Sequence, residues 1–321
     1  MIIFLKKVVL LTFIIALCGC EPIKNTQNKG DSELTEYKKI AITHSLGTSV
    51  ISYAPKKVVA LDMNEVDALD QLQVPVAGMP KDFVPHFLAD YKDNQSIRDV
   101  GAIVQPNIER IYALKPDIIL MTSLQANYYQ ELSELAPTLY FDVNYLDSGV
   151  GHIEKIKEHM LVLGEIFNKQ VLAKEKVDKL DSKFKRAKKQ IETRSEKAMI
   201  VLHNNGALRY FGVQSRYGFI YNALGVKPAS LSAEAGSHGQ PISHEFMYKY
   251  DPDIIYVIDR TAVMENKIAI KQIDLDNPLL QQTNAWKNNR IQFVDSEAWY
   301  ITGASYTSLM IIIDDVLAGY L

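Results

Sequence analysis

Cysteine is nearly absent from this 321-residue chain, which has 2, Cys18 and Cys20, both close to the N-terminus. The rest of the chain therefore has no means of forming a disulfide framework. Positive charge is not in excess either, because 35 lysines and arginines stand against 38 aspartates and glutamates, for a net charge of -3. A nucleic-acid partner is therefore not expected.

The motifs of common catalytic sites are also missing. The sequence contains no GxSxG nucleophile turn, no phosphate-binding glycine loop and no HExxH zinc motif. Its 7 histidines are scattered and do not form a metal-binding pattern. We therefore expect a protein that is not an enzyme and has no intrinsic cofactor.

The N-terminus carries the pattern of an export signal. Lys6 and Lys7 precede an apolar run, residues 8–17, which is too short for a stable transmembrane helix. The run ends in the sequence LCGC, which resembles a bacterial lipobox. That resemblance implies a lipoprotein signal peptide at residues 1–19 and a lipid on Cys20. Ordinary signal cleavage, with Cys20 incidental, is the alternative.

Residues 20–37 follow this signal and are polar and without periodicity. Such a composition predicts a flexible tether between a membrane and a folded domain. Cleavage of the signal also removes Lys6 and Lys7, which changes the formal charge from -3 to -5.

One sequence unit occurs twice in the remaining chain. IERIYALKPDIIL, residues 108–120, is matched by HEFMYKYDPDIIY, residues 244–256, at a constant offset of 136. Each copy has a helical pattern that stops before a proline and then a β-branched run typical of a buried parallel strand. The repeat predicts two similar α/β lobes, although a single helix-strand unit of this kind also arises by chance.

Other segments fit this organisation. KKVVALD (56–62) and VPVAGM (74–79) have the composition of strands on either side of a helical pattern, and AMIVLHN (198–204) and NRIQFVD (289–295) indicate later strands. A long proline-free helical segment lies between them and breaks near residues 164–168. We expect a first lobe at 38–167, an inter-lobe helix at 168–194 and a second lobe at 195–321.

The sequence resembles the helical-backbone class of substrate-binding proteins of ABC importers, in particular lipoproteins that bind ferric siderophores. The matching segments cover essentially all of residues 38–321 and include PNIERIYALKPDII, SRYGFIYNALGV, SHGQPISHEFMYKYDPDIIYVIDR and VDSEAWYITGASYTSLMIIIDDV. The likeness is strongest to binders of catecholate and mixed catecholate/hydroxamate siderophores. It implies an α/β fold of two Rossmann-like lobes, joined by a long backbone helix, with a ligand cleft between them.

The same resemblance implies the biological setting. The expected cargo is an Fe(III)-siderophore, and the expected partner is an ABC permease dimer with its ATPase subunits. The chain would act as a monomer, at the periplasmic face of a Gram-negative membrane or the outer face of a Gram-positive cell membrane. A binder of haem, cobalamin or a bare transition metal ion is the alternative, and a passive lipoprotein adhesin is a third reading.

Glu109 and Glu245 occupy equivalent positions in the two copies of the repeat. A matched pair of carboxylates, one per lobe, suits arginine pockets on the two subunits of a permease, and family resemblance implies the same docking role. The alternative is that each glutamate only favours the first turn of its helix.

His238 and Tyr300 fall where catecholate binders of this family have a histidine and a tyrosine that ligate iron. Fe(III) prefers oxygen ligands, and a siderophore that fills four of its six positions leaves two for the protein. Hydrogen bonding or stacking against a saturated complex is the alternative role. Trp299, beside Tyr300, is the third aromatic or imidazole residue of the expected ligand site.

Arg216 and Arg260 match the second-lobe arginines of catecholate binders and would neutralise an anionic complex. The first lobe departs from the family pattern, because residues 123–125 read SLQ where relatives commonly have an arginine. Two cations in place of three predict a less anionic ligand, unless Arg98 or Arg209 reaches the cleft.

Overall fold

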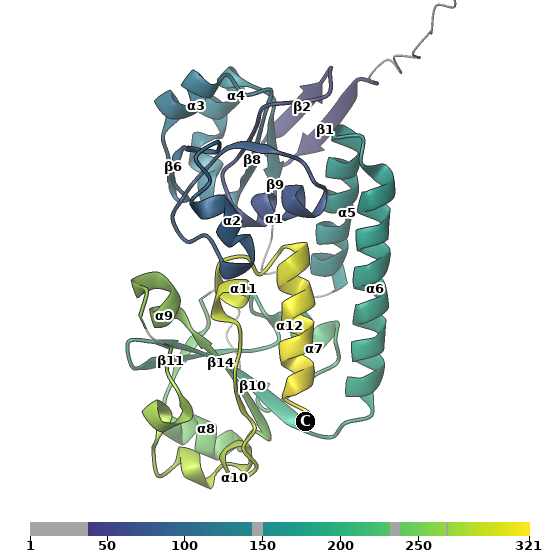
Figure 1. The fold of residues 1–321 in the computed structure, drawn as a ribbon. Helices are drawn as coiled ribbons and strands as arrows, with labels where there is room; N and C mark the ends of the chain where they lie inside the picture. The colour runs from purple at the N-terminus through teal and green to yellow at the C-terminus, as the bar shows by residue number, and fades with distance from the viewer. Residues whose placement is uncertain (1–37, 143–149, 232–237, 268) are drawn as a thin grey trace, which may run out of the picture. The chain divides into compact units, whose positions relative to one another are not determined.

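The structure is a computed structural model of the chain, and it describes residues 38–142, 150–231, 238–267 and 269–321. The expected signal peptide, the tether, Cys20 and Ser237 of the SHG sequence lie outside the described residues. Two main sheets, each with its own helices, organise the described part (Figure 1). We call them, with their helices, the first lobe and the second lobe.

The first lobe has an all-parallel sheet in the strand order β5-β4-β3-β8-β9. Its strands are β3 (Val58–Ala60), β4 (Val76–Met79), β5 (Arg98–Asp99), β8 (Ile118–Thr122) and β9 (Thr138–Phe141). Its helices are α1 (Met63–Gln71), η1 (His86–Leu88), α2 (Ala89–Lys92), α3 (Ile108–Leu114), η2 (Ser123–Tyr128) and α4 (Tyr129–Leu135). Two small hairpins complete it: β1 (Ile40–His44) with β2 (Gly47–Ile51), and β6 (Gly101–Ala102) with β7 (Gln105–Pro106).

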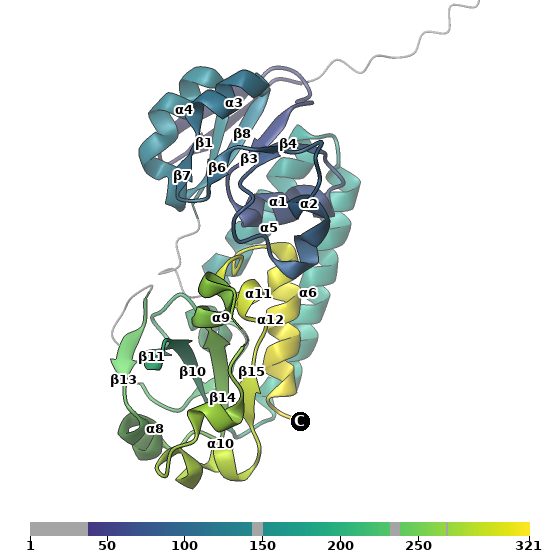
Figure 2. The ribbon, with the colours of Figure 1, turned by 60° about the vertical axis from the view of Figure 1, so that its left-hand side comes forward.

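The second lobe has a mixed sheet in the order β13-β11-β10-β14-β15, with β12 paired to β10. Its strands are β10 (Lys197–Asn204), β11 (Ala207–Phe211), β12 (Lys227–Pro228), β13 (Gln240–Ile242), β14 (Ile254–Asp259) and β15 (Ile291–Phe293). Strands β10, β14 and β15 run parallel, whereas β11 and β13 form antiparallel pairs, as Figure 2 shows. The helices are α7 (Gly218–Asn222), α8 (His244–Tyr250), α9 (Arg260–Glu265), η3 (Gln272–Leu275), η4 (Leu280–Gln282), α10 (Asn284–Lys287) and α11 (Ser296–Tyr300).

Three longer helices connect the lobes. They are α5 (Val150–Ile166), α6 (Gln170–Glu192) and the last helix, α12 (Tyr306–Ala318). Helix α6 packs against α5 and α12 along one side of the two sheets (Figure 1). One continuous cluster of buried apolar side chains runs from the first-lobe sheet through these helices into the second-lobe sheet. The expected fold, two Rossmann-like lobes with a long backbone helix, is confirmed, and the two lobes share a core.

The sequence repeat is also a structural repeat. Helices α3 and α8 each begin at a side-chain cap, in which Asn107 and Ser243 accept a hydrogen bond from the backbone N–H three residues later. Each helix ends in a left-handed residue, Lys115 or Asp251. The strand that follows, β8 or β14, pairs in parallel with the strand that comes first along the chain in the main sheet of its lobe, β3 or β10. Chance similarity is therefore not needed to explain the repeat.

Among the described residues, none of the helices is both long enough and apolar enough to cross a membrane.

Candidate functional site

A pocket of about 400 Å³ lies at the carboxyl ends of β10 and β14, the edge of a parallel sheet where ligands commonly bind. Its volume lies in the usual range for a small-molecule site. Two apolar side chains contribute to its wall, and the other described residues that line it are polar or charged: Asn204, Arg209, Arg216, His238, Arg260 and Tyr300. None of the described residues that line it is acidic.

Tyr300 and two arginines form the centre of this pocket. Arg260 Nε donates a 2.6 Å hydrogen bond to the Tyr300 hydroxyl oxygen, and Arg260 Nη1 donates to Asn204 Oδ1 at 2.9 Å. Arg216 Nη2 donates to the Tyr300 carbonyl oxygen at 3.2 Å. Both guanidinium carbons lie over the Tyr300 ring within cation–π range of its centre, at 5.5 Å for Arg216 and 5.4 Å for Arg260. Three residues that the sequence analysis selected are thus in contact.

Arg209 adds a third cation to the pocket from β11. Its Nε and Nη2 donate hydrogen bonds of 2.6 Å to the carbonyl oxygens of His238 and Gly239, so it fixes the backbone of the loop that carries His238. The His238 side chain is exposed and lines the same pocket. Of the two arginines that the sequence analysis left open, Arg209 therefore reaches the pocket, and it comes from the second lobe.

The first lobe has no arginine at the predicted place, and the side chains there have other roles. Gln125 is fully buried, and its amide donates to the carbonyl oxygens of Leu61 and Ile103. Leu124, which the 136-residue offset aligns with Arg260, is 54% exposed. Arg98 is exposed on β5 and does not line this pocket.

The prediction that Trp299 contacts the ligand is wrong for this structure, because its side chain is fully buried. Its ring N–H donates to Asp315 Oδ2 at 2.8 Å, and burial raises the pKa of the Asp315 carboxyl above its ordinary value. Neighbouring residues of a helix point in different directions. Helix α11 therefore directs Trp299 into the core and Tyr300 toward the pocket.

One pocket residue, Asn204, was not found from the sequence, and Arg209 was named there only as one of two arginines that could reach the cleft. Asn204 is the last residue of β10, where the strand AMIVLHN ends, and an asparagine at a strand end gives no signal beyond a turn. Arg209 lies within a short strand whose neighbours, Leu208 and Tyr210, are both buried. The expected alternation of buried and exposed residues does not single it out.

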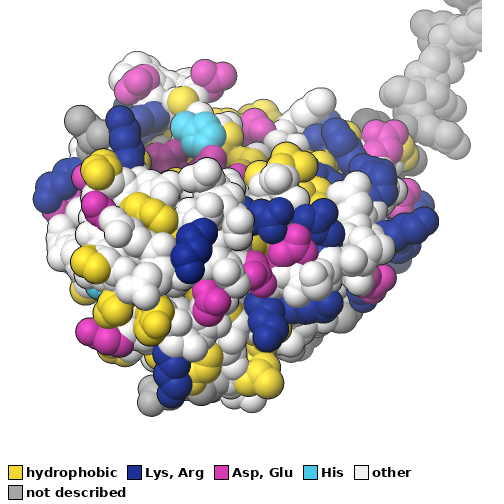
Figure 3. Space-filling view, turned by 90° about the horizontal axis from the view of Figure 1, so that it is seen from below, with side chains coloured by type: hydrophobic (Ala, Val, Ile, Leu, Met, Phe, Trp, Pro, Cys, Tyr) yellow, Lys and Arg dark blue, Asp and Glu magenta, His cyan; other side chains and the backbone are white. Residues whose placement is uncertain are grey.

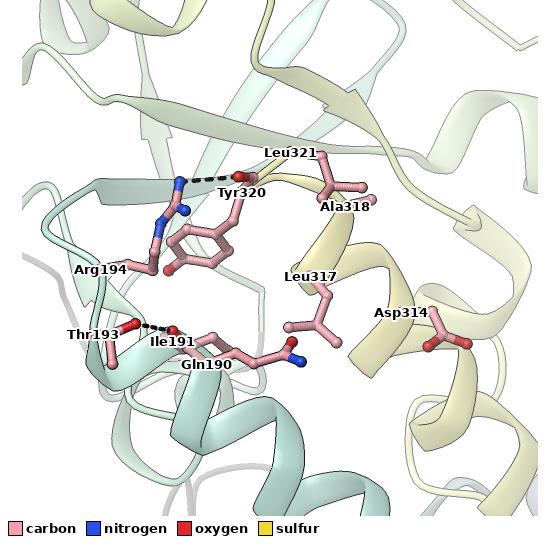
Figure 4. Close-up of a pocket in the computed structure, with 9 residues that line it drawn as sticks. All are labelled: Gln190, Ile191, Thr193, Arg194, Asp314, Leu317, Ala318, Tyr320 and Leu321. Atoms are coloured by element: carbon pink, nitrogen blue, oxygen red, sulfur yellow. Dashed lines mark hydrogen bonds between the residues drawn. The ribbon is translucent and has the colours of Figure 1, made fainter.

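A larger cavity, of about 500 Å³, lies between the ends of α6 and α12 (Figure 4). Among the described residues that line this cavity, Arg194 is the one cationic side chain, and it is already engaged with Glu196 and with the Tyr320 carbonyl oxygen. Figure 3 shows the molecule from below the view of Figure 1, and acidic and basic side chains are mixed over this outer face. The pocket around Tyr300 is the stronger candidate site, because three arginines gather there and none of its described lining residues is a carboxylate.

The two predicted docking glutamates are exposed residues in the first turns of α3 and α8. Among the described residues, neither Glu109 nor Glu245 forms an ion pair. Three residues later each helix has an exposed tyrosine, Tyr112 at 66% and Tyr248 at 45%. Both helices lie on the side of the sheets away from α6 (Figures 1 and 2).

The fold and the pocket define a two-lobed α/β binding protein. The sequence profile of the periplasmic binding protein family matches residues 58–298. The chain belongs to this family.

Relatives and solved structures agree with this assignment. The chain is 57% identical to the ferric-anguibactin-binding protein FatB of Vibrio anguillarum, over 96% of this chain and 94% of the relative. It is 33% identical to the petrobactin-binding protein YclQ of Bacillus subtilis, over 95% and 94%. The structure of the siderophore-binding protein BauB, bound to two molecules of acinetobactin and ferric iron, superimposes with a TM-score of 0.84 at 57% identity. That match covers 88% of this chain and 99% of BauB.

Proposed function

We propose that this protein binds a ferric siderophore in the pocket around Tyr300 and delivers it to an ABC importer for iron uptake. The observation that carries the proposal is the group of Arg209, Arg216 and Arg260 around one phenol, without a lining carboxylate among the described residues. Three nearby cations repel one another when the pocket is empty, so an anionic ligand is favoured. Relatives named for ferric anguibactin, petrobactin and acinetobactin support this class of ligand.

We propose that Tyr300 and His238 complete the coordination of the iron. A hydroxyl oxygen has two lone pairs, and Arg260 uses one of those on Tyr300. The second is available to a metal ion. The His238 ring accepts or donates no hydrogen bond within the described residues, so a ring nitrogen is free for a metal. Both donors suit Fe(III) bound to a ligand that fills four positions.

We propose that Glu109 and Glu245 dock the two lobes to the two halves of a permease. Their support is the structural repeat, which gives each lobe an exposed carboxylate on the same turn of the same short helix, beside an exposed tyrosine. A partner with two-fold symmetry and a cationic pocket in each half would fit both. Family membership supports a permease dimer with ATPase subunits as this partner.

The remaining proposals concern the rest of the chain. We propose an exported lipoprotein with its lipid on Cys20, a signal peptide at 1–19 and a tether at 20–37, acting as a monomer. The relatives include lipoproteins by name, which supports export. We propose lobe limits at 38–167 and 195–321, with a joining helix at 168–194, and the order of the two sheets along the chain supports this division.

The test is a titration of the full chain in detergent with four ferric complexes: a tris-catecholate, a tetradentate bis-catecholate, a mixed catecholate/hydroxamate and a tris-hydroxamate. Fluorescence quenching gives the affinity, and visible absorption reports a phenolate-to-iron charge-transfer band. We expect tight binding of the tetradentate or mixed complex, with a band that shifts in Tyr300→Phe and weaker binding in His238→Ala. Tyr53→Phe and His244→Ala are matched controls away from the pocket.

Two outcomes distinguish the proposed siderophore ligand from the proposed ligation of iron by Tyr300 and His238. No binding of any of the four complexes would overturn the proposed function. Binding that is unchanged in both pocket variants would retain the siderophore ligand and reject direct iron ligation.

A further inference from the structure

Tyr300 lies in a short stretch of the second lobe, residues 295–304, that we call the Tyr300 segment. The first lobe contacts this segment close to its beginning. His86 Nδ1 lies 2.9 Å from Glu297 Oε2, and the His86 backbone N–H donates to the same oxygen at 2.6 Å. His86 Nε2 lies 3.3 Å from Asp295 Oδ2. One residue of the first lobe therefore contacts two carboxylates that precede Tyr300 by a few positions.

The first lobe also contacts the other end of the Tyr300 segment. The backbone N–H of Ala304 donates a 3.1 Å hydrogen bond to Asn64 Oδ1, at the start of α1. Asn64 is itself held in place, because its backbone N–H and side-chain amide both donate to Asp62 Oδ1, at 2.8 and 2.6 Å. Thr122, at the end of β8, donates to the other Asp62 oxygen at 3.2 Å. This chain of hydrogen bonds joins the strand ends of the first lobe to the residues after Tyr300.

The two contacts differ in strength. Asn64 is only 5% exposed, and a buried hydrogen bond that loses its acceptor leaves an unsatisfied N–H. The His86 side chain is 59% exposed, so its ion pairs are screened by water and contribute less. Asn64 is therefore the main contact and His86 the secondary one.

We propose that Asn64 and His86 are positioning residues for the ligand site, through which the first lobe sets the position of Tyr300 in the second-lobe pocket. Neither residue lines the pocket. The consequence is that binding at Tyr300 and the relative position of the lobes are coupled. A partner that separates the lobes would displace both ends of the Tyr300 segment through these contacts. The affinity of the pocket for its ligand would then fall. This inference rests on the proposed function for its ligand, and on the hydrogen bonds above for its mechanism.

The first test needs no ligand. Hydrogen exchange of the Trp299 and Ile301 amides is measured in the full chain and in the variants Asn64→Ala and His86→Ala. The Trp299 amide donates to the Asp295 carbonyl oxygen and the Ile301 amide to that of Glu297, across α11 and its two capping residues. Their exchange rates therefore report how stably the Tyr300 segment is folded. We expect faster exchange at both amides in Asn64→Ala and a smaller increase in His86→Ala. The matched control is Lys183→Ala, which removes contacts between α6 and α12 at Met310 and Asp314 and leaves the segment untouched.

The second test is a double-mutant cycle on affinity for ferric anguibactin and ferric acinetobactin. We expect Asn64→Ala to weaken binding about tenfold and His86→Ala about threefold, with little further loss from either in a Tyr300→Phe background, since all act through one side chain. Equal losses in both backgrounds, or unchanged exchange at Trp299 and Ile301, would overturn the positioning role. If the wild type binds neither complex while exchange still responds to Asn64→Ala, the proposed function fails and the link between the lobes stands.

Discussion

Arg260 donates hydrogen bonds to the Tyr300 hydroxyl oxygen through Nε, at 2.6 Å, and to Asn204 Oδ1 through Nη1, at 2.9 Å. The planar guanidinium can meet both partners because its donors are held in a rigid fork. It is thereby fixed at the edge of the pocket between the end of β10 and the end of α11. This single side chain joins the cationic and the phenolic parts of the candidate site.

The first prediction concerns that geometry. Arg260→Lys keeps the charge but has one nitrogen in place of the fork, so it cannot make both contacts. We expect affinity for ferric anguibactin to fall about tenfold in Arg260→Lys and further in Arg260→Ala, in a fluorescence titration. Lys249→Ala, a change of a surface cation on α8, is the control. Equal affinity in wild type and Arg260→Lys would mean that charge alone matters at this position.

The second prediction concerns docking. Glu109→Lys and Glu245→Lys should leave ligand affinity unchanged, since both residues lie outside the pocket. Each should reduce stimulation of the cognate permease-ATPase complex in lipid nanodiscs several-fold at low salt, and the double variant should reduce it more. Raising the salt concentration should narrow these differences.

The control for docking is Glu134→Lys, an exposed acid on α4 that lies outside the repeat and has Ile270 at the 136-residue offset. Loss of stimulation by this control as large as that of the two docking variants would indicate an effect of net charge. It would speak against the two specific contacts.

The third prediction tests the repeat as a source of stability. Asp117 Oδ2 accepts hydrogen bonds from the backbone N–H groups of Lys56 and Lys57, at 2.7 and 2.8 Å. Asp253 Oδ2 accepts the equivalent bond from Lys197 at 2.9 Å. Each aspartate therefore ties the strand after the repeat helix to the start of the neighbouring strand of its lobe.

We expect Asp117→Ala and Asp253→Ala each to lower the free energy of unfolding by about 1–3 kcal/mol, since hydrogen bonds to a charged acceptor are lost. The effects should add in the double variant, because the two aspartates belong to different sheets and share no hydrogen-bond partner. Urea unfolding measures both. Asp178→Ala, which removes an exposed ion pair with Lys174, should change stability by less than about 1 kcal/mol.

Much of the fold could be predicted from the sequence because its signals are local. The proline after α3 and after α8, and the β-branched runs of β8 and β14, mark the same boundary twice. The break in the long helical segment was also predictable, and Phe167–Lys169 separates α5 from α6. The antiparallel edge of the second sheet was not, because β11 and β13 are short and their pairing joins residues some 30 positions apart.

The candidate site was predictable only in part. Family resemblance supplied His238, Tyr300, Arg216 and Arg260, which the structure brings to one pocket. The sequence could not decide between Arg98 and Arg209 as a further cation, because the role of Arg209 depends on a strand pairing that brings β11 beside the His238 loop. The prediction for Trp299 was wrong because it rested on the position of this residue next to Tyr300 in the sequence. Two adjacent residues of a helix do not lie on the same face.

The last prediction concerns the pH dependence of stability. Asp62 is buried at the N-terminus of α1, and burial raises the pKa of its carboxyl from 3.8 to about 6. The folded chain therefore holds this proton more tightly than the unfolded chain does. Its contribution to stability is fully present below about pH 4 and is lost as pH rises to about 6. The size of this loss is about 3 kcal/mol.

Asp62→Asn should remove that dependence, because a neutral amide oxygen can still accept the bonds from Asn64 and cap the helix. We expect the variant to be more stable than wild type at pH 8 and to lose this advantage by pH 4, in urea unfolding across that range. Asp93→Asn, at an exposed aspartate of the same lobe, should show no such crossover. A variant that is less stable than wild type at pH 8 would mean that the ionised carboxylate is needed to hold Asn64 and Thr122, and that the network between the lobes depends on its charge.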